Sequence, residues 1–161
     1  MKKRVLVVLV LLTIIGVMAF AQRVGDSVQL DGKPYIVESV SGDRVVLQRA
    51  SLDGVWRNAA TGRVTAINGS SGTINSIDSS SGLYQDAVNK GYIKVGDQEF
   101  RNLRSTGNLT WSGQVLKADG FANNPNTATG ASYANGTLTL SADGRTMTVT
   151  LAAGSATYTR Q

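Results

Sequence analysis

Residues 137–151 show the clearest pattern in the chain, a strict alternation of apolar residues with threonines on both sides of Asp143-Gly144. Successive side chains of a β-strand point to opposite faces, so this alternation places the apolar side chains on one face. An Asp-Gly pair between two such runs is a strong signal for a β-hairpin. The segment therefore predicts a hairpin with one buried face, formed by Leu138, Leu140, Met147, Val149 and Leu151.

Short runs of a similar kind recur from residue 52 onwards, separated by Gly, Asn and Asp turn signals. They predict strands at residues 55–58, 63–68, 73–77, 92–95, 99–103, 109–117, 137–141, 145–151 and 156–160. Many short strands at this spacing are typical of an antiparallel barrel or sandwich. We predict a mainly β fold, an antiparallel β-barrel with one short helix, preceded by a small β-meander.

Residues 83–90 interrupt the β pattern. Leu83 and Ala87, and likewise Tyr84 and Val88, are four positions apart and would share one face of a helix. Gly91 suits the position just after a helix C-terminus, where a left-handed backbone is common. The segment predicts a short helix, which would either plug an open end of the barrel or lie against its wall.

Three stretches rich in Ser, Gly, Asn and Thr predict loops, at residues 68–72, 78–82 and 121–132. The third is long and polar and begins with an aromatic residue, Phe121. On a barrel, such a loop often forms the rim that faces a ligand. The alternative is a surface connection without a binding role.

The stretch from residue 24 to residue 49 predicts a three-stranded meander. Alternating or β-branched runs at residues 27–30, 35–40 and 44–48 are separated by Asp31-Gly32 and by Ser41-Gly42-Asp43. A sheet of this size is marginal alone. We expect it to pack on the barrel or to form a small SH3-like appendage.

The first 21 residues have the pattern of an export signal. Lys2, Lys3 and Arg4 precede a nearly unbroken apolar run over residues 5–20, and Ala19-Phe20-Ala21 offers small residues at the cleavage site. The alternative is a retained anchor, for which the run is short against a hydrocarbon core of about 30 Å. We predict a signal peptide at 1–21, a meander at 22–50 and a barrel domain at 51–161, exported to the periplasm or the extracellular medium without stable membrane insertion after cleavage.

Charge and composition narrow the classes of function. The formal charge is +5, but loss of the three basic residues of the signal leaves 13 Lys and Arg against 11 Asp and Glu, a balance of +2. The remaining cations are scattered, so we expect no nucleic-acid partner. The sequence has no His and no Cys, which excludes a Ser-His-Asp triad, a thiol nucleophile and an ordinary zinc site. We expect no enzyme activity, no cofactor and no metal.

A hydrolase that uses two carboxylates is the one enzymatic alternative. Apart from Glu38 and Glu99, the acidic residues after the signal are all Asp. Several of these adjoin Gly and are typical of turns, among them Asp26, Asp31, Asp43, Asp97, Asp119 and Asp143.

Gly54-Val55-Trp56, at the start of the predicted barrel, resembles the entry signature of the lipocalin (calycin) superfamily. The resemblance implies that Trp56 closes the narrow end of the barrel and that a basic residue of a late strand lies across its ring, a role open to Arg160 or Arg145. It also implies a cup with an apolar interior for a small hydrophobic ligand, or a close-packed relative without a cavity.

Four residues are candidates for ligand binding: Trp111, Tyr92, Arg101 and Phe121. For Trp111, as for Trp56, the alternative is a place in the core. For residues 91–103, the alternative is a surface hairpin with Lys94–Glu99 or Glu99–Arg101 pairing. Our leading hypothesis is an exported, non-enzymatic barrel that binds a small apolar ligand or a saccharide. The alternative is an envelope-associated structural or protein-interaction module, and the oligomeric state is open.

Overall fold

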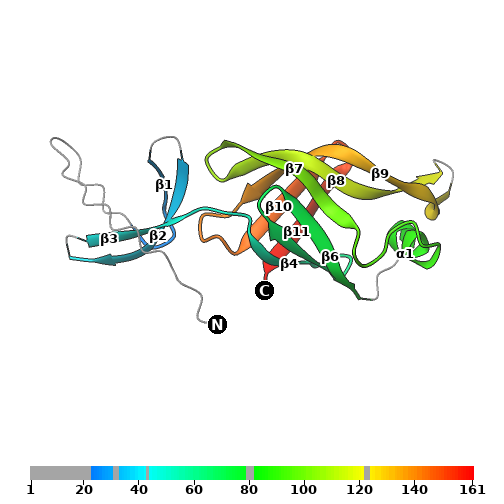
Figure 1. Cartoon of the computed structure of the whole chain (residues 1–161), viewed down its shortest axis with the longest axis horizontal. Helices are drawn as coiled ribbons and strands as arrows, with labels where there is room; N and C mark the ends of the chain where they lie inside the picture. Colours follow the sequence, from blue (N-terminus) through cyan, green and yellow to red (C-terminus); the bar gives the residue numbers. More distant parts are fainter. Residues whose placement is uncertain (1–22, 31–32, 43, 79–81, 122–123) are drawn as a thin grey trace.

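The computed structural model describes residues 23–30, 33–42, 44–78, 82–121 and 124–161. The predicted signal peptide lies outside these residues. The chain forms a small three-stranded sheet followed by a closed eight-stranded barrel with one helix (Figure 1). The predicted fold class is therefore confirmed. The sheet and the helix lie at opposite ends of the barrel (Figure 1).

The three-stranded sheet comprises β1 (Ser27–Leu30), β2 (Lys33–Ser41) and β3 (Arg44–Arg49), all antiparallel with β2 in the centre. It contacts the barrel through Ile36, which packs against the main barrel core. Leu52, in the connection to the barrel, is buried in the same core. This sheet therefore contributes to covering one end of the barrel.

The barrel is an up-and-down meander in which each strand pairs with the next along the chain. Its strands are β4 (Gly54–Asn58), β5 (Arg63–Asn68), β6 (Ser71–Ile77), β7 (Gln98–Gly107), β8 (Thr110–Phe121), β9 (Asn124–Leu140), β10 (Thr146–Leu151) and β11 (Gly154–Arg160). The last strand closes on the first, with Arg160 opposite Trp56 and Tyr158 opposite Asn58. Closure removes the free sheet edges that an open sheet of this size would leave.

The alternation at residues 137–151 places side chains as the sequence predicts. Leu138, Leu140, Met147 and Val149 are buried in the main core, and Leu151 packs against it partly buried. The hairpin partners stand opposite one another, with Met147 facing Leu140 and Val149 facing Leu138.

Two predicted elements are wrong. Residues 92–95 form no strand, because the chain folds back onto the end of the preceding helix: Tyr92 N–H donates to Ala87 O at 2.9 Å, and a turn closes between Lys94 and Asp97. Ile93 is buried there as predicted, but Val95 is 57% exposed instead of core.

The predicted loop at 121–132 is also wrong, because β9 runs from residue 124 to residue 140 and pairs with β8 up to its end. The sequence of this stretch is too polar to signal a strand. Tertiary packing supplies the stabilisation instead, since Ala128, Ala131 and Tyr133 pack in a second apolar cluster with the helix.

The predicted helix is confirmed as α1 (Gly82–Asn89). Its fully buried residue, Ala87, packs with Ile74, Ile93, Leu116 and Ala128. Asp86 accepts a hydrogen bond from Ala128 N–H at 2.6 Å, which ties the helix to β9. The helix therefore lies against the outer part of the β8–β9 ribbon, beside one end of the barrel (Figure 1).

Candidate functional site

One end of the barrel is closed by Trp56 and Arg160. Trp56 is fully buried, and its indole N–H donates to Leu52 O at 2.7 Å. The guanidinium carbon of Arg160 lies 4.3 Å from the centre of the indole ring, a cation–π geometry. Partial burial lowers the pKa of Arg160 from its ordinary value. Of the two basic residues that could take this place, the structure puts Arg160 over the ring.

Arg160 also ties two segments of backbone, the connection before β4 and the turn between β9 and β10, to the last strand. Its guanidinium donates to the carbonyl oxygens of Ser51, Asp53 and Gly144, at 2.9, 2.6 and 2.8 Å. Gly54 leaves the room for this: a Cβ at that position would lie 2.8 Å from Arg160 Nη1, and its φ is +134°. The Gly-x-Trp sequence thus combines a flat platform for the cation with a residue that has no side chain to displace it.

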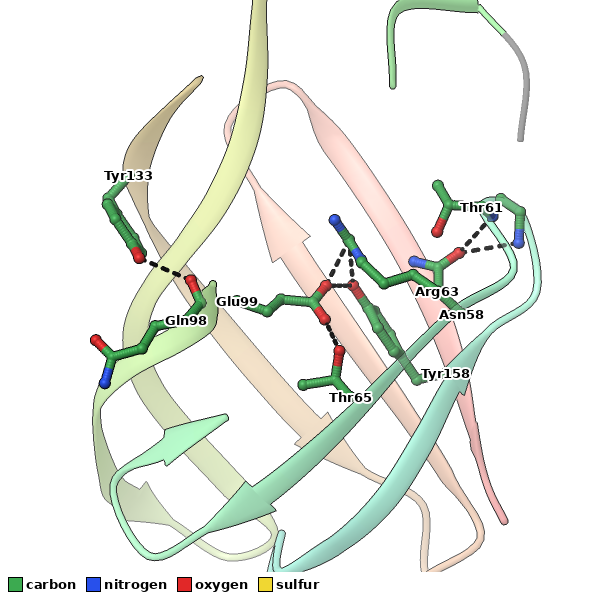
Figure 2. A network of polar contacts seen from close by, with 9 residues as sticks. Asn58, Thr61, Arg63, Thr65, Gln98, Glu99, Tyr133 and Tyr158 are labelled. Carbon is green, nitrogen blue, oxygen red and sulfur yellow. Dashed lines mark hydrogen bonds and ion pairs between the residues drawn. The ribbon is translucent and has the colours of Figure 1, made fainter. Parts of the chain in front are cut away.

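A buried polar network crosses the barrel interior, and sequence reasoning missed it. Arg63 on β5, Glu99 on β7 and Tyr158 on β11 converge there from three strands (Figure 2). Arg63 Nη2 lies 2.5 Å from Glu99 Oε1 and 2.9 Å from Tyr158 Oη, and the Tyr158 hydroxyl donates to Glu99 Oε1 at 2.5 Å. Thr65 donates to the other carboxylate oxygen. All four side chains are buried, with Glu99 0% exposed and Arg63 5%.

A β-bulge turns Glu99 into the barrel. Gly72 on β6 stands opposite Phe100, and Thr73 opposite Gln98, so Glu99 has no partner in the ladder. A bulge of this kind re-aims a side chain, and here Glu99 and Phe100 are both buried although they are adjacent. The surface pairing of Glu99 with Lys94 or Arg101 that the sequence offered as an alternative is therefore wrong. Glu99 pairs with Arg63 instead.

The environment of the network fixes its charge states. Burial is the largest single influence on the pKa of Arg63 and lowers it, but the attractions of Glu99, Tyr158 and Tyr84 together outweigh burial, and the pKa is raised overall. Burial and the Glu99 charge both raise the pKa of Tyr158. At neutral pH Arg63 is thus a cation and Tyr158 a neutral donor. The Arg63 cation has the Glu99 side chain as its ion-pair partner, and a buried cation requires such a partner.

Arg63 also carries groups that the network does not use. Its Nε and Nη1 atoms are buried and have no hydrogen-bond partner among the described residues. The ring of Tyr84, on α1, covers the guanidinium at 4.5 Å from its centre. The hydroxyl of Tyr84 is likewise buried, and no described residue meets hydrogen-bond geometry with it. Burial raises the pKa of Tyr84, although the nearby Arg63 guanidinium opposes this shift.

A pocket of about 330 Å³ opens beside these residues, at the helix end of the barrel. Arg63, Tyr84 and Tyr158 line it together with Lys117. The rest of the wall is mostly apolar and comes from α1, β8, β10 and β11 and the turn between the last two: Leu83, Val115, Leu116, Ala118, Val149, Leu151, Ala153 and Ala156. Lys117 is ion-paired with Asp119, which also accepts from Ser132 at 2.9 Å. The arrangement can enclose a small apolar molecule beside a few polar groups.

The four residues predicted to bind ligand do not converge, and none of them lines this pocket. Trp111 is 9% exposed and belongs to the main core. Tyr92 is 42% exposed, beyond the end of α1. Arg101 lies over the ring of Tyr133 at 3.5 Å and donates to Gln114 at 2.8 Å. Phe121 is the last residue of β8, and its side chain lies outside the described part of the structure.

The alternation itself carried a signal for the missed residues. Along β5, the buried positions are Arg63, Thr65 and Ile67, so an arginine occupies the same inward face as a core isoleucine. Tyr158 holds the buried position of β11 in the same way. A charged residue in register with core positions is informative, because Arg is almost never fully buried without a partner.

The closed eight-stranded antiparallel barrel is compatible with a lipocalin-like fold. Comparison of the chain with protein families, with curated proteins and with solved structures finds no match. Within the described ranges, no helix has the length and apolar character needed to cross a membrane. The same residues contain no group of three or more acidic side chains placed to hold a metal ion.

Proposed function

We propose that this chain is an exported, non-enzymatic, lipocalin-like barrel that binds a small apolar ligand in the pocket beside α1. The observation that supports this most is the pocket itself, with a volume of about 330 Å³ and a largely apolar wall. Ligand sites of small molecules have volumes of about 300–1,000 Å³ and combine an apolar lining with a few polar groups. Arg63, Tyr84 and Tyr158 supply those polar groups here.

An interior ligand is favoured over a saccharide bound at the rim. Stacking on a sugar needs an exposed aromatic face, and Trp111 is only 9% exposed within the main core. The pocket wall instead offers aliphatic side chains from three strands and the helix. Such a surface suits an apolar molecule, because burying apolar area drives binding.

Binding can be tested with N-phenyl-naphthylamine, an uncharged dye that fluoresces in apolar surroundings. We expect saturable binding to the full chain. Ala156, which lines the pocket, offers a blocking variant: Ala156→Phe fills the space and should abolish the signal without unfolding the protein. Val95→Phe is the matched control, since it adds the same ring at an exposed position. Absence of saturable binding, or full binding by the Ala156→Phe variant, would overturn the proposal.

Export forms part of the proposal and has its own test. The basic start, the apolar run and Ala19-Phe20-Ala21 support cleavage before Gln22. In a bacterial host that expresses the full chain, we expect the protein outside the cytoplasm to have the intact mass of residues 22–161. Recovery of the full-length mass from the membrane fraction would contradict cleavage.

A second candidate function is a protein-interaction module of the cell envelope. It is favoured by Val40 and Val45, which face each other across β2 and β3 and are 42% and 38% exposed. A photo-reactive amino acid at position 45 should then cross-link to a partner in the host, and the same group at exposed position 95 should not. Equal labelling at both positions would count against this candidate.

A further inference from the structure

We propose that the ligand is uncharged and carries a hydrogen-bond acceptor, such as a carbonyl or ether oxygen, that binds the free N–H groups of Arg63. This inference rests on the proposed function, because it concerns the same pocket. It goes further in naming the chemical class of the ligand and the residues that select it.

The first argument is the donor inventory of Arg63. A guanidinium has five N–H donors. The contacts of Arg63 with Glu99 and Tyr158 are made through Nη2, while Nε and Nη1 have no partner among the described residues. One guanidinium nitrogen points away from Glu99 (Figure 2). Buried donors are nearly always paired, so two unpaired nitrogens of one cation at a pocket wall indicate a place for an acceptor.

The second argument is a matching group on the helix. Tyr84 lines the same pocket, stacks on Arg63, and has a buried hydroxyl without a partner among those residues. A carbonyl or ether oxygen has two lone pairs and can accept from two donors. A single ligand oxygen can therefore satisfy Arg63 and the Tyr84 hydroxyl together.

The third argument is charge balance. The pocket wall contains two cations, and both already have a carboxylate partner: Arg63 with Glu99, and Lys117 with Asp119. A ligand carboxylate would be a second anion beside buried Glu99, with no unpaired cation in the described wall to offset it. Like charges at a buried site oppose one another strongly. The wall therefore selects an acceptor without charge.

The test compares three ligands of equal chain length as competitors of N-phenyl-naphthylamine at neutral pH: methyl hexyl ketone, octanoate and octane. We expect the ketone to bind at least about ten times more tightly than octanoate, and a tenfold ratio corresponds to about 1.4 kcal/mol of binding free energy. Octanoate binding as tightly as the ketone, or more tightly, would overturn the inference.

Two variants separate hydrogen bonding from apolar burial. Tyr84→Phe removes only the hydroxyl and should weaken the ketone severalfold while leaving octane unchanged. Arg63→Met combined with Glu99→Leu removes both charges together, so no buried charge stays unpaired, and it should weaken the ketone about tenfold or more without weakening octane. If the double variant does not fold, the Tyr84→Phe variant and the comparison of the ketone with octanoate still test whether the pocket selects an uncharged acceptor.

The outcomes distinguish this inference from the proposed function. If neither the dye nor any of the three ligands binds, both are overturned. If the dye and all three ligands bind, but the ketone and octane respond alike to Tyr84→Phe, then the pocket binds apolar ligands and the selection by Arg63 and Tyr84 is wrong.

Discussion

Arg160, on the last strand of the barrel, lies 4.3 Å above the indole ring of Trp56 on the first. The two residues also stand opposite each other in the ladder that closes the barrel. Closure by backbone hydrogen bonds is thus reinforced by a side-chain contact at the same place. Because Arg160 donates to carbonyls of the connection before β4 and of the β9–β10 turn, this contact also fixes the segments that cover the end of the barrel.

Trp56→Ala should lower the free energy of unfolding by about 3–5 kcal/mol, the range for truncating a large buried aromatic side chain. The variant leaves a cavity in the core and removes both the platform for Arg160 and the hydrogen bond to Leu52. Urea unfolding followed by far-UV circular dichroism measures the change. Val95→Ala, at an exposed position, is the control and should have little effect. A Trp56→Ala variant with an unchanged melting temperature would show that the indole is not part of the core.

Gly54→Ala and Gly154→Ala form a matched pair that measures the contact of Arg160 with Gly54. Both glycines have positive φ, +134° and +143°, so each substitution carries a similar backbone strain of about 1–3 kcal/mol. At Gly54 the new Cβ would lie 2.8 Å from Arg160 Nη1, whereas at Gly154 nothing lies within 4 Å. We expect Gly54→Ala to destabilise more, as measured by thermal unfolding. Equal losses would mean that the guanidinium moves aside at no cost.

The sequence predicted the general arrangement of strands, helix and meander because the positions of these elements follow from local alternation and turn residues. Strands β4, β5, β10 and β11, the helix and the meander all have clear periods and turn residues, and each falls within a few positions of its prediction. Most of β8 and the end of β9 were also predicted, but the first part of β9 was predicted as a loop, because its stabilisation comes from packing against α1, which local composition does not express.

The sequence offered a barrel with an apolar cup as one alternative, but the residues that line the pocket were not predicted, for a different physical reason. The polar network beside the pocket joins residues from β5, β7 and β11 that lie up to 95 positions apart in the chain, and its carboxylate turns inward only through a bulge at Glu99. The apolar residues of this strand, such as Phe100 and Leu103, do not reveal from the sequence alone where a bulge interrupts the alternation of inward and outward side chains. Arg63 had a readable signal in its register with Ile67, whereas the stacking of Tyr84 on it depends on where the helix docks.

Glu99→Gln should lower stability by about 3–5 kcal/mol, because it leaves the buried Arg63 cation without its carboxylate. Arg63→Met should lower the stability by a similar amount, because it leaves the buried Glu99 side chain without its cation. The double variant Arg63→Met with Glu99→Leu should recover much of the loss, since replacing a buried ion pair with apolar side chains is often neutral or stabilising. Chemical unfolding of the three variants and the unaltered chain checks this. Single losses that simply add in the double variant would show that the two charges do not interact.

Docking of the helix should weaken in acid through Asp86. The hydrogen bond and ion pair with Lys90, at 2.8 Å, and the hydrogen bond from Ala128 N–H hold the pKa of Asp86 below its ordinary value of 3.8. A carboxyl whose native pKa is depressed contributes stability that is present above the ordinary pKa and is lost as the pH falls through the lower native pKa. The stability difference between the unaltered chain and Asp86→Asn should therefore be full at neutral pH and should shrink as the pH falls below 3.8. Lys90→Met removes the cation and should reduce this pH dependence. A stability difference that stays constant down to the acid limit would mean that the Asp86 contacts do not depend on its charge.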